Sequence, residues 1–462
     1  MSKTNVYGLF IAVILLCSGN TVFAQVGNTT GSAEVVLLQG LNNDSILSAF
    51  SRRFVVLDSL LQCTAEPEEA FAWVGGCAST DVLDSVFDEK EAYERKAFLR
   101  KHGLELTGQA YYRLDDQLGF DEDDQYSRYK AKFQGEVGWN LFNSSFLQRK
   151  SELRLINLSN QAERLQQQRK LFSPTKNHTE EAIKKYYDAL SAAVLHEQLL
   201  NNEVLQKAYL FVLETNRASN EKLLENNTEK MRIEHALAQT GVTTPEELRA
   251  IRILQPAWVE VDSARLLAHV RENHIELQES HVRGEILDAR IRLTNYAHEL
   301  RLTPFVRVSH YLRTGIGPKS STNVEVGARF TFPFYGDASA KRKALRTEQA
   351  INALGRETLS ETLAEQCHRL LDQLNRLNVA IDAEQRHADL LRRFIALRKE
   401  GYLNSQNGYN HVARLEEYNE YLKSLERTYS LLRERALCLL DIQKTAGYPD
   451  MAPLLRMKEI RK

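Results

Sequence analysis

Residues 323–337 read NVEVGARFTFPFYGD, and they hold the clearest pattern in the 462-residue chain. Along residues 324–332, apolar side chains alternate with charged, polar or small ones. A strict period of two predicts a β-strand that has one apolar face and one wet face. Pro333 and Gly336 then interrupt the strand, and a long helical pattern begins at Ala338. The stretch is therefore predicted to be a strand that turns directly into a long helix.

A similar arrangement occurs earlier in the chain, at residues 129–141. Each of these two strands follows another alternating stretch, at residues 104–114 and 305–313. Each stretch is close to the ~9–11 residues that a tilted strand needs to cross a bilayer. Because the polar faces carry charges in register, we interpret the apolar faces as lipid-facing rather than as the core of a soluble sandwich. The aromatic residues assigned to this lipid-facing band are Tyr112, Tyr129, Phe133, Trp139, Phe330 and Phe332.

Long helical patterns follow and separate the strands. They cover residues 145–240, 262–302, 338–400 and 409–446, and apolar residues in the last two step by threes and fours. Such spacing over several heptads predicts helices that pack side by side as in a coiled coil. Pro174 is expected to end or kink the first of them, because proline removes a helical hydrogen bond.

Two helical hairpins are predicted, and their tips differ in clarity. Gly401 opens the second tip at residues 401–408. The first tip lacks such a glycine, and residues 199–202 and 225–228 are both candidates for it. The order strand, loop, strand, helix, turn, helix therefore occurs twice, which predicts an internal duplication. The polar residues near Gly401 at this second tip are Asn404, Gln406 and Asn407.

The number of strands has a consequence for assembly. The smallest transmembrane barrels have about eight strands, so four strands in one chain cannot close a barrel. Unpaired strand edges are not tolerated in lipid. The chain is therefore expected to form oligomers through its strands.

The first 24 residues are typical of a secretory signal peptide. Lys3 supplies a positive charge, residues 9–17 form a short apolar core, and Ala24 ends a cleavage site. These flanks favour cleavage over an uncleaved anchor or lipidation at Cys17. The formal net charge is −1, which excludes the basic footprint of a nucleic-acid-binding protein.

Four cysteines remain after cleavage. Cys63 and Cys77 flank a short stretch and are candidates for a disulfide in an exported protein. Cys367 and Cys438 lie on the paired helical patterns and are interpreted as small core side chains.

The 462 residues contain no nucleotide-binding, hydrolase or zinc-protease motif, so we expect neither an enzyme nor a bound cofactor or metal. Three histidines of one predicted helix lack partner ligands for a metal, and we interpret them as surface decoration, that is, exposed residues without a metal-binding role: His269, His274 and His281.

Three stretches together resemble the TolC-like outer membrane efflux protein family. Residues 323–337 are similar to the family's last strand with its turn into a long helix. Residues 262–312 are similar to the helix that ends at a proline before a strand, and residues 398–425 to a hairpin tip. The resemblance covers about residues 100–447. It implies a mainly α fold with a small antiparallel β part, in which a homotrimer forms a twelve-stranded barrel and a coiled-coil tunnel.

The resemblance also implies a division of the chain and a function. Its parts would be the signal peptide (1–24), an N-terminal periplasmic segment (25–100), two repeats (101–257 and 258–447) and a tail (448–462). The function implied is an outer membrane channel subunit of a tripartite efflux or type I secretion system in a Gram-negative bacterium. Its partners would be outer membrane lipid, a periplasmic adaptor (membrane fusion) protein and an inner-membrane pump. The second tip would meet the adaptor and form a gate, and the residues assigned to it are Gly401, Asn404, Gln406 and Asn407. The alternative is an exported coiled-coil scaffold that forms no channel.

Overall fold

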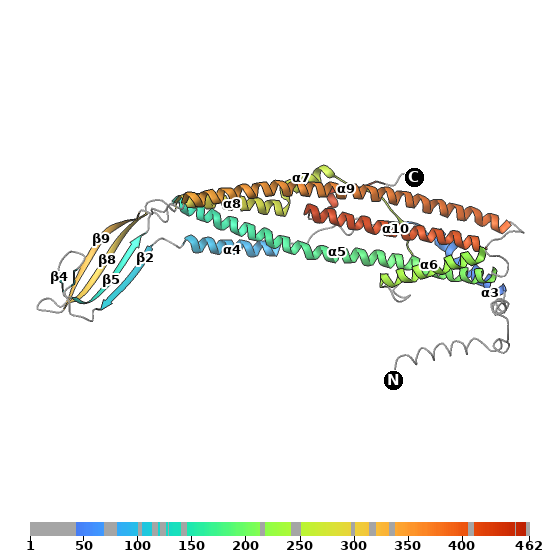
Figure 1. Ribbon diagram of the computed structural model, residues 1–462, viewed down its shortest axis with the longest axis horizontal. Helices are drawn as coiled ribbons and strands as arrows, with labels where there is room; N and C mark the ends of the chain where they lie inside the picture. The colour runs from blue at the N-terminus through green and yellow to red at the C-terminus, as the bar shows by residue number, and fades with distance from the viewer. Residues whose placement is uncertain are drawn as a thin grey trace, which may run out of the picture.

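The structure is a computed structural model, and it describes residues 43–68, 81–99, 104–112, 119–120, 126–127, 129–139, 146–212, 218–241, 251–296, 301–313, 320–331, 338–404, 411–448 and 450–458. The molecule is elongated, with a β-sheet at one end and helices that lie side by side and extend to the other end (Figure 1). The expected mainly α fold with a small antiparallel sheet is confirmed.

The sheet contains four antiparallel strands in the order β2-β5-β8-β9. They are β2 (Leu104–Tyr112), β5 (Tyr129–Trp139), β8 (Arg301–Arg313) and β9 (Ser320–Thr331). All four predicted strands are present, although β8 begins four residues earlier than expected and includes Pro304. Pro304 fits because the pairing of β8 with β5 begins only at Phe305, so the proline has a partner strand on one side.

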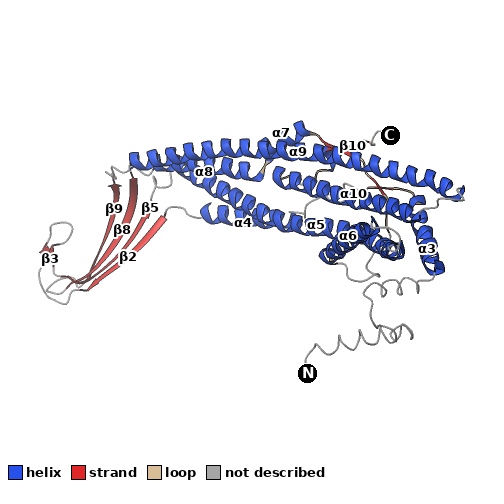
Figure 2. Cartoon of the chain, turned by 45° about the vertical axis from the view of Figure 1, so that its right-hand side comes forward, coloured by secondary structure: helices blue, strands red, loops and turns tan. Residues whose placement is uncertain are grey.

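Two helices of 67 residues each form the length of the body: α5 (Phe146–Val212) and α9 (Ala338–Asn404). At 1.5 Å per residue, each is about 100 Å long. Near the sheet, α4 (Asp81–Leu99) packs on α5, and α8 (Ile275–Tyr296) packs between α5 and α9. Farther away, α6 (Ala218–Thr240) packs on α5, and α10 (His411–Ala446) packs between α5 and α9 (Figure 2).

Pro174 does not end the helix, which was one of the two predicted outcomes, because α5 continues through that residue. A single lost hydrogen bond is a local cost, and packing against five other helices outweighs it. The predicted helix at 262–302 is instead two helices, α7 (Ser263–Asn273) and α8, separated by His274 in an extended conformation. Helix α7 begins where the Asp262 side chain accepts a hydrogen bond from the Arg265 backbone N–H.

Both candidates for the first hairpin tip are also wrong. Helix α5 ends at Val212 and α6 begins at Ala218, so the connection lies at residues 213–217. Asn201 and Asn202, which lie in the first candidate stretch, are fully buried inside α5. Their side chains form hydrogen bonds between helices. The local sequence alone cannot distinguish such buried polar residues from the polar residues of a turn.

The helices enclose two main hydrophobic clusters, and α10 contributes to both. The predicted heptad seam is confirmed, since Leu415, Leu422 and Tyr429 of α10 are fully buried. Helix α3 (Asn43–Gln62) adds its apolar face to the cluster at the end far from the sheet. Cys367 and Cys438 are buried free thiols in the other cluster, as expected for core residues.

Short strands lie between the helices. The parallel pair β1 (Glu66–Pro67) and β6 (Leu254–Gln255) joins segments almost 200 residues apart. The antiparallel pair β7 (Trp258–Val261) and β10 (Leu455–Lys458) includes part of the predicted C-terminal tail, after the 3-10 turn η1 (Ala452–Leu454). A hairpin of β3 (Gly119–Phe120) and β4 (Tyr126–Ser127) lies beyond the main sheet (Figure 1).

Candidate functional site

One face of the four-stranded sheet is apolar and exposed. The register places Val326 of β9 beside Val306 of β8, and Val306 beside Val137 of β5. These three side chains are 81%, 44% and 47% exposed, although they are as apolar as core residues. Other large apolar side chains on the same face are also exposed: Leu104, Leu106, Tyr112, Phe133, Trp139, Val308, Leu312, Val324 and Phe330. A continuous apolar face of this kind marks a surface that meets lipid or protein.

Four of the six predicted lipid-facing aromatic residues lie on this face: Tyr112, Phe133, Trp139 and Phe330. Tyr129 begins β5, but its side chain is outside the described residues, as is the whole of Phe332. The predicted aromatic band is therefore exposed on one face of the sheet wherever the band is described.

The opposite face of the sheet carries a cluster of charged side chains. Arg307 Nη2 donates to Glu136 Oε2 at 3.0 Å, and its other terminal nitrogen, Nη1, lies 3.4 Å from Glu325 Oε2. Arg329 Nη2 lies 3.3 Å from the second oxygen of Glu136. Both guanidinium groups also lie over the ring of Phe305, at 5.0 and 5.5 Å from its centroid. These contacts join three strands and give the sheet one strongly polar face.

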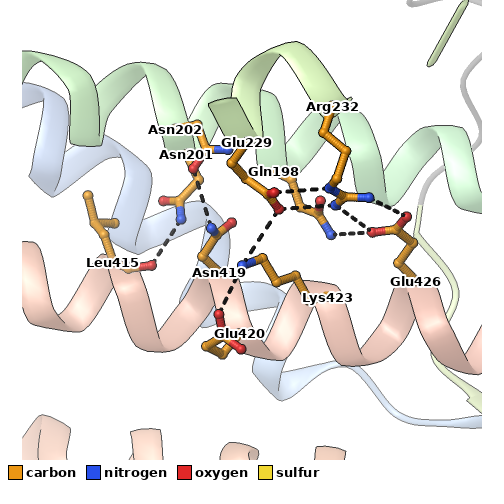
Figure 3. A network of polar contacts seen from close by, with 10 residues as sticks. All are labelled: Gln198, Asn201, Asn202, Glu229, Arg232, Leu415, Asn419, Glu420, Lys423 and Glu426. Carbon is orange, nitrogen blue, oxygen red and sulfur yellow. Dashed lines mark hydrogen bonds and ion pairs between the residues drawn. The ribbon is translucent and has the colours of Figure 1, made fainter. Parts of the chain in front are cut away.

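The far end of the helical body contains a second polar network, which joins α5, α6 and α10 (Figure 3). Asn201 donates to the carbonyl oxygen of Leu415 at 3.0 Å, and Asn419 donates to the side-chain oxygen of Asn202 at 3.3 Å. Gln198, also fully buried, donates to Glu426 at 3.2 Å. Buried amides of this kind fix one alignment of the helices, because a shift would leave them without partners.

Ion pairs continue this network toward the surface. Arg232 of α6 is 3.0 Å from Glu229 and 3.4 Å from Glu426 of α10. Lys423 of α10 is 3.6 Å from Glu229 and 3.0 Å from Glu420. The hydrogen bond to Glu229 raises the pKa of Arg232, so that charge is retained at any physiological pH. The two helical hairpins are thus joined by charge as well as by packing.

The structure describes only part of the predicted gate at the second tip. Gly401 and Asn404 lie in the last turn of α9, which is longer than expected, and their side chains are outside the described residues. Gln406 and Asn407 lie wholly outside them. Nearby, Arg398 of α9 pairs with Glu417 of α10. Sequence reasoning missed this pair because the two residues lie on different helices.

A buried ion pair near the middle of the body was also missed. Arg435 of α10 and Glu68, which follows β1, have side chains 1% and 4% exposed. Glu68 also accepts a hydrogen bond from the Tyr187 hydroxyl, and Arg435 donates to the carbonyl oxygen of Ala257. Burial raises the pKa of Glu68, and the arginine charge partly offsets that effect. Arg435 lies next to the seam residue Ala436, where heptad spacing alone does not distinguish a buried charge from an exposed one.

Two of the three histidines, His269 and His274, are not surface decoration as predicted, whereas His281 is exposed as expected. His274 is 7% exposed and lies against Gly447, and the His269 ring packs on Tyr448. Burial lowers the pKa of both histidines.

Cys63 has an exposed thiol, and Cys77 lies outside the described residues, so their bridge stays a prediction. Of the helices that the structure describes, none combines the length and low charge needed to span a membrane.

Comparisons with known proteins support the fold. Neither a protein-family model nor a curated protein matches the sequence. Among solved structures, the outer membrane protein VceC from Vibrio cholerae is 11% identical, with a TM-score of 0.50 over 86% of this chain and 96% of that one. The Campylobacter jejuni CmeC outer membrane channel is 10% identical, with a TM-score of 0.50 over 94% of this chain and 91% of that one. The chain therefore shares the fold of these outer membrane proteins, as its resemblance to the TolC-like family led us to expect.

Proposed function

We propose that this chain is the subunit of an outer membrane channel that conducts solutes passively from the periplasm to the exterior. The observation that carries the proposal is the four-stranded sheet. Its exposed apolar face suits lipid, and its opposite face, with the Glu136 and Arg307 cluster, suits a water-filled lumen. The fold that the chain shares with two outer membrane proteins gives independent support.

The assembly follows from the edges of that sheet. Among the described residues, β2 pairs only with β5, and β9 pairs only with β8. Edges left open in lipid are unfavourable, so each subunit would join its neighbours through β2 and β9. Three copies would give a twelve-stranded barrel, and the long helices would continue it as a periplasmic tunnel. The similar element order of the two halves would reflect a duplication.

The distal end of the tunnel would contain the gate. The helical hairpins end there, and the tip residues Gly401, Asn404, Gln406 and Asn407 would meet an adaptor protein that is held by an inner-membrane pump. Movement of one hairpin against the other would open the mouth, and contact with the adaptor would favour the open state. The pump would supply the energy, so no catalytic step is assigned to this chain.

The experiment that tests this proposal begins with membrane fractionation of cells that express the full chain. We expect the protein in outer membranes, a trimer on an unboiled gel after detergent extraction, and conductance in planar bilayers. Boiling should convert the trimer to monomers, which is the control. A monomer extracted without detergent would instead support the exported coiled-coil scaffold.

A further inference from the structure

Helix α3 occupies an unexpected place. It precedes the first strand of the main sheet by more than 40 residues, yet it lies at the end of the body farthest from that sheet (Figures 1 and 2). Its buried stripe is Ile46, Phe50, Phe54, Leu57 and Leu60, spaced by threes and fours. The stripe shares one hydrophobic cluster with α5, α9 and α10. Helix α3 therefore contacts both hairpins close to their ends.

Polar contacts reinforce this packing near the tip of the second hairpin. Asp58 of α3 accepts hydrogen bonds from Arg414 of α10 at 2.9 and 3.0 Å and from the Tyr418 hydroxyl. Lys399, near the end of α9, is 2.8 Å from the same carboxylate. One carboxylate on α3 thus holds side chains from both helices of the hairpin.

A second set of contacts ties α3 to the first hairpin and to the start of α10. Arg53 pairs with Glu197 of α5 at 2.5 Å and is 7% exposed. The rings of Phe50 and Phe54 stack on His411, the first residue of α10, at centroid distances of 5.1 and 5.9 Å. The α9–α10 hairpin therefore cannot move away from α5 at this end unless the α3 contacts break.

We propose that α3 is a latch that holds the distal ends of the two hairpins together, and that its release allows the tunnel mouth to widen. This inference rests on the proposed function, because a latch needs a gate to hold. Asp58 is its central residue, since it is the one described α3 carboxylate that binds both α9 and α10. Loss of that carboxylate favours the open arrangement while the apolar stripe keeps α3 folded.

The test compares wild-type protein with Asp58→Asn in planar bilayers, without an adaptor. We expect a rise of about tenfold or more in open probability, the effect of losing charge-assisted hydrogen bonds. Lys399→Gln removes one partner of Asp58 and should give a smaller rise in the same direction. Lys90→Gln is the matched control, because Lys90 is also 40% exposed and pairs between helices, but near the sheet.

Restoring the connection should reverse the effect. Arg392 of α9 donates to the backbone oxygen of Cys63, one residue after α3. In Asp58→Asn, Cys77→Ser, Arg392→Cys protein, where Cys63 cannot form the predicted disulfide, a short bis-maleimide should join position 392 to Cys63 and return the open probability to the wild-type value. The same treatment of a chain that also carries Cys63→Ser should not.

The outcomes separate the two proposals. If wild-type trimers conduct and both variants show unchanged open probability, the latch is wrong and the channel stands. If neither wild type nor Asp58→Asn conducts, the proposed function fails and the latch fails with it. If Asp58→Asn does not form trimers, Lys399→Gln decides the question, because that side chain is half-exposed and its loss leaves the core intact.

Discussion

We expect single buried charges to have large effects in this molecule, because they lie between helices rather than on the surface. Arg435 is the clearest case, with its side chain 1% exposed beside Glu68 and Tyr187. Arg435→Met should lower the free energy of unfolding by about 3–5 kcal/mol, because it leaves a buried carboxylate without its partner. Thermal unfolding followed by circular dichroism would measure the change.

The control for that prediction is another ion pair of the same region. Lys458 and Glu260 join β10 to β7 but are 61% and 38% exposed. Lys458→Met should change stability by less than about 1 kcal/mol. If both substitutions lowered the melting temperature equally, burial would not be the source of the effect.

Buried histidines give the protein a predictable response to acid. Burial lowers the pKa of His269, His274 and His411 below the ordinary value of 6.5. The unfolded chain therefore binds protons at these sites more readily than the folded chain does. Their contribution to stability is present above pH 6.5 and is lost as pH falls through the lowered values.

We therefore expect the melting temperature to fall between about pH 7 and pH 5. His274→Gln should make this fall smaller, because it removes the most buried of the three rings. His368→Gln, at an exposed position of α9, is the control and should leave the fall unchanged. A pH dependence that was identical in all three proteins would contradict the assignment.

The sheet is the element on which the membrane assignment depends. Val326→Arg places a charge on the exposed apolar face of β9, where lipid contact would cost about 2–4 kcal/mol near the bilayer midplane. We expect fewer trimers in outer membranes, measured on unboiled gels. Asn323→Arg places the same charge on the opposite face of the same strand and should be tolerated. Equal loss in both variants would mean that the apolar face does not meet lipid.

At the scale of elements, periodicity carried most of the prediction. The four main strands and the coiled-coil seam of α9 and α10 follow directly from alternation and from heptad spacing. The short strands β1 and β6 could not be found in this way, because two-residue segments have no period and their partner lies far away in the sequence. The position of α3 was also hidden, because its packing partners on α5, α9 and α10 lie far away in the sequence.

The candidate site was predicted less completely than the fold. The apolar face of the sheet could be read from one strand, because alternation places every second residue on the same side. Contacts such as Asp58 with Arg414 join residues 356 positions apart, and a single sequence has no signal for such pairs. Buried amides are hard to place for a related reason, since Asn201 and Asn202 are as polar inside a helical body as they would be in a turn.

The whole molecule has an arrangement that suits closure into a ring. Because neighbouring strands in the sheet run in opposite directions, the edge strands β2 and β9 also run in opposite directions. Strand β9 of one copy can therefore pair with β2 of the next in the same antiparallel manner as the pairs within one chain. Repetition around a threefold axis would leave no open edge.

Cysteine cross-linking between copies tests that closure. Gly108→Cys on β2 is accommodated, because a Cβ atom there meets nothing within 4 Å. In a Cys63→Ser, Cys77→Ser background, we would combine it in turn with cysteine at Thr322, Val324, Val326 or Ala328, which share the apolar face of β9. At least one pair should oxidise to a linked trimer on a denaturing gel. The control is Gly108→Cys with Val308→Cys, on an interior strand, which should give monomers only. Trimers that form but never cross-link through β9 would show that the subunits meet through another surface.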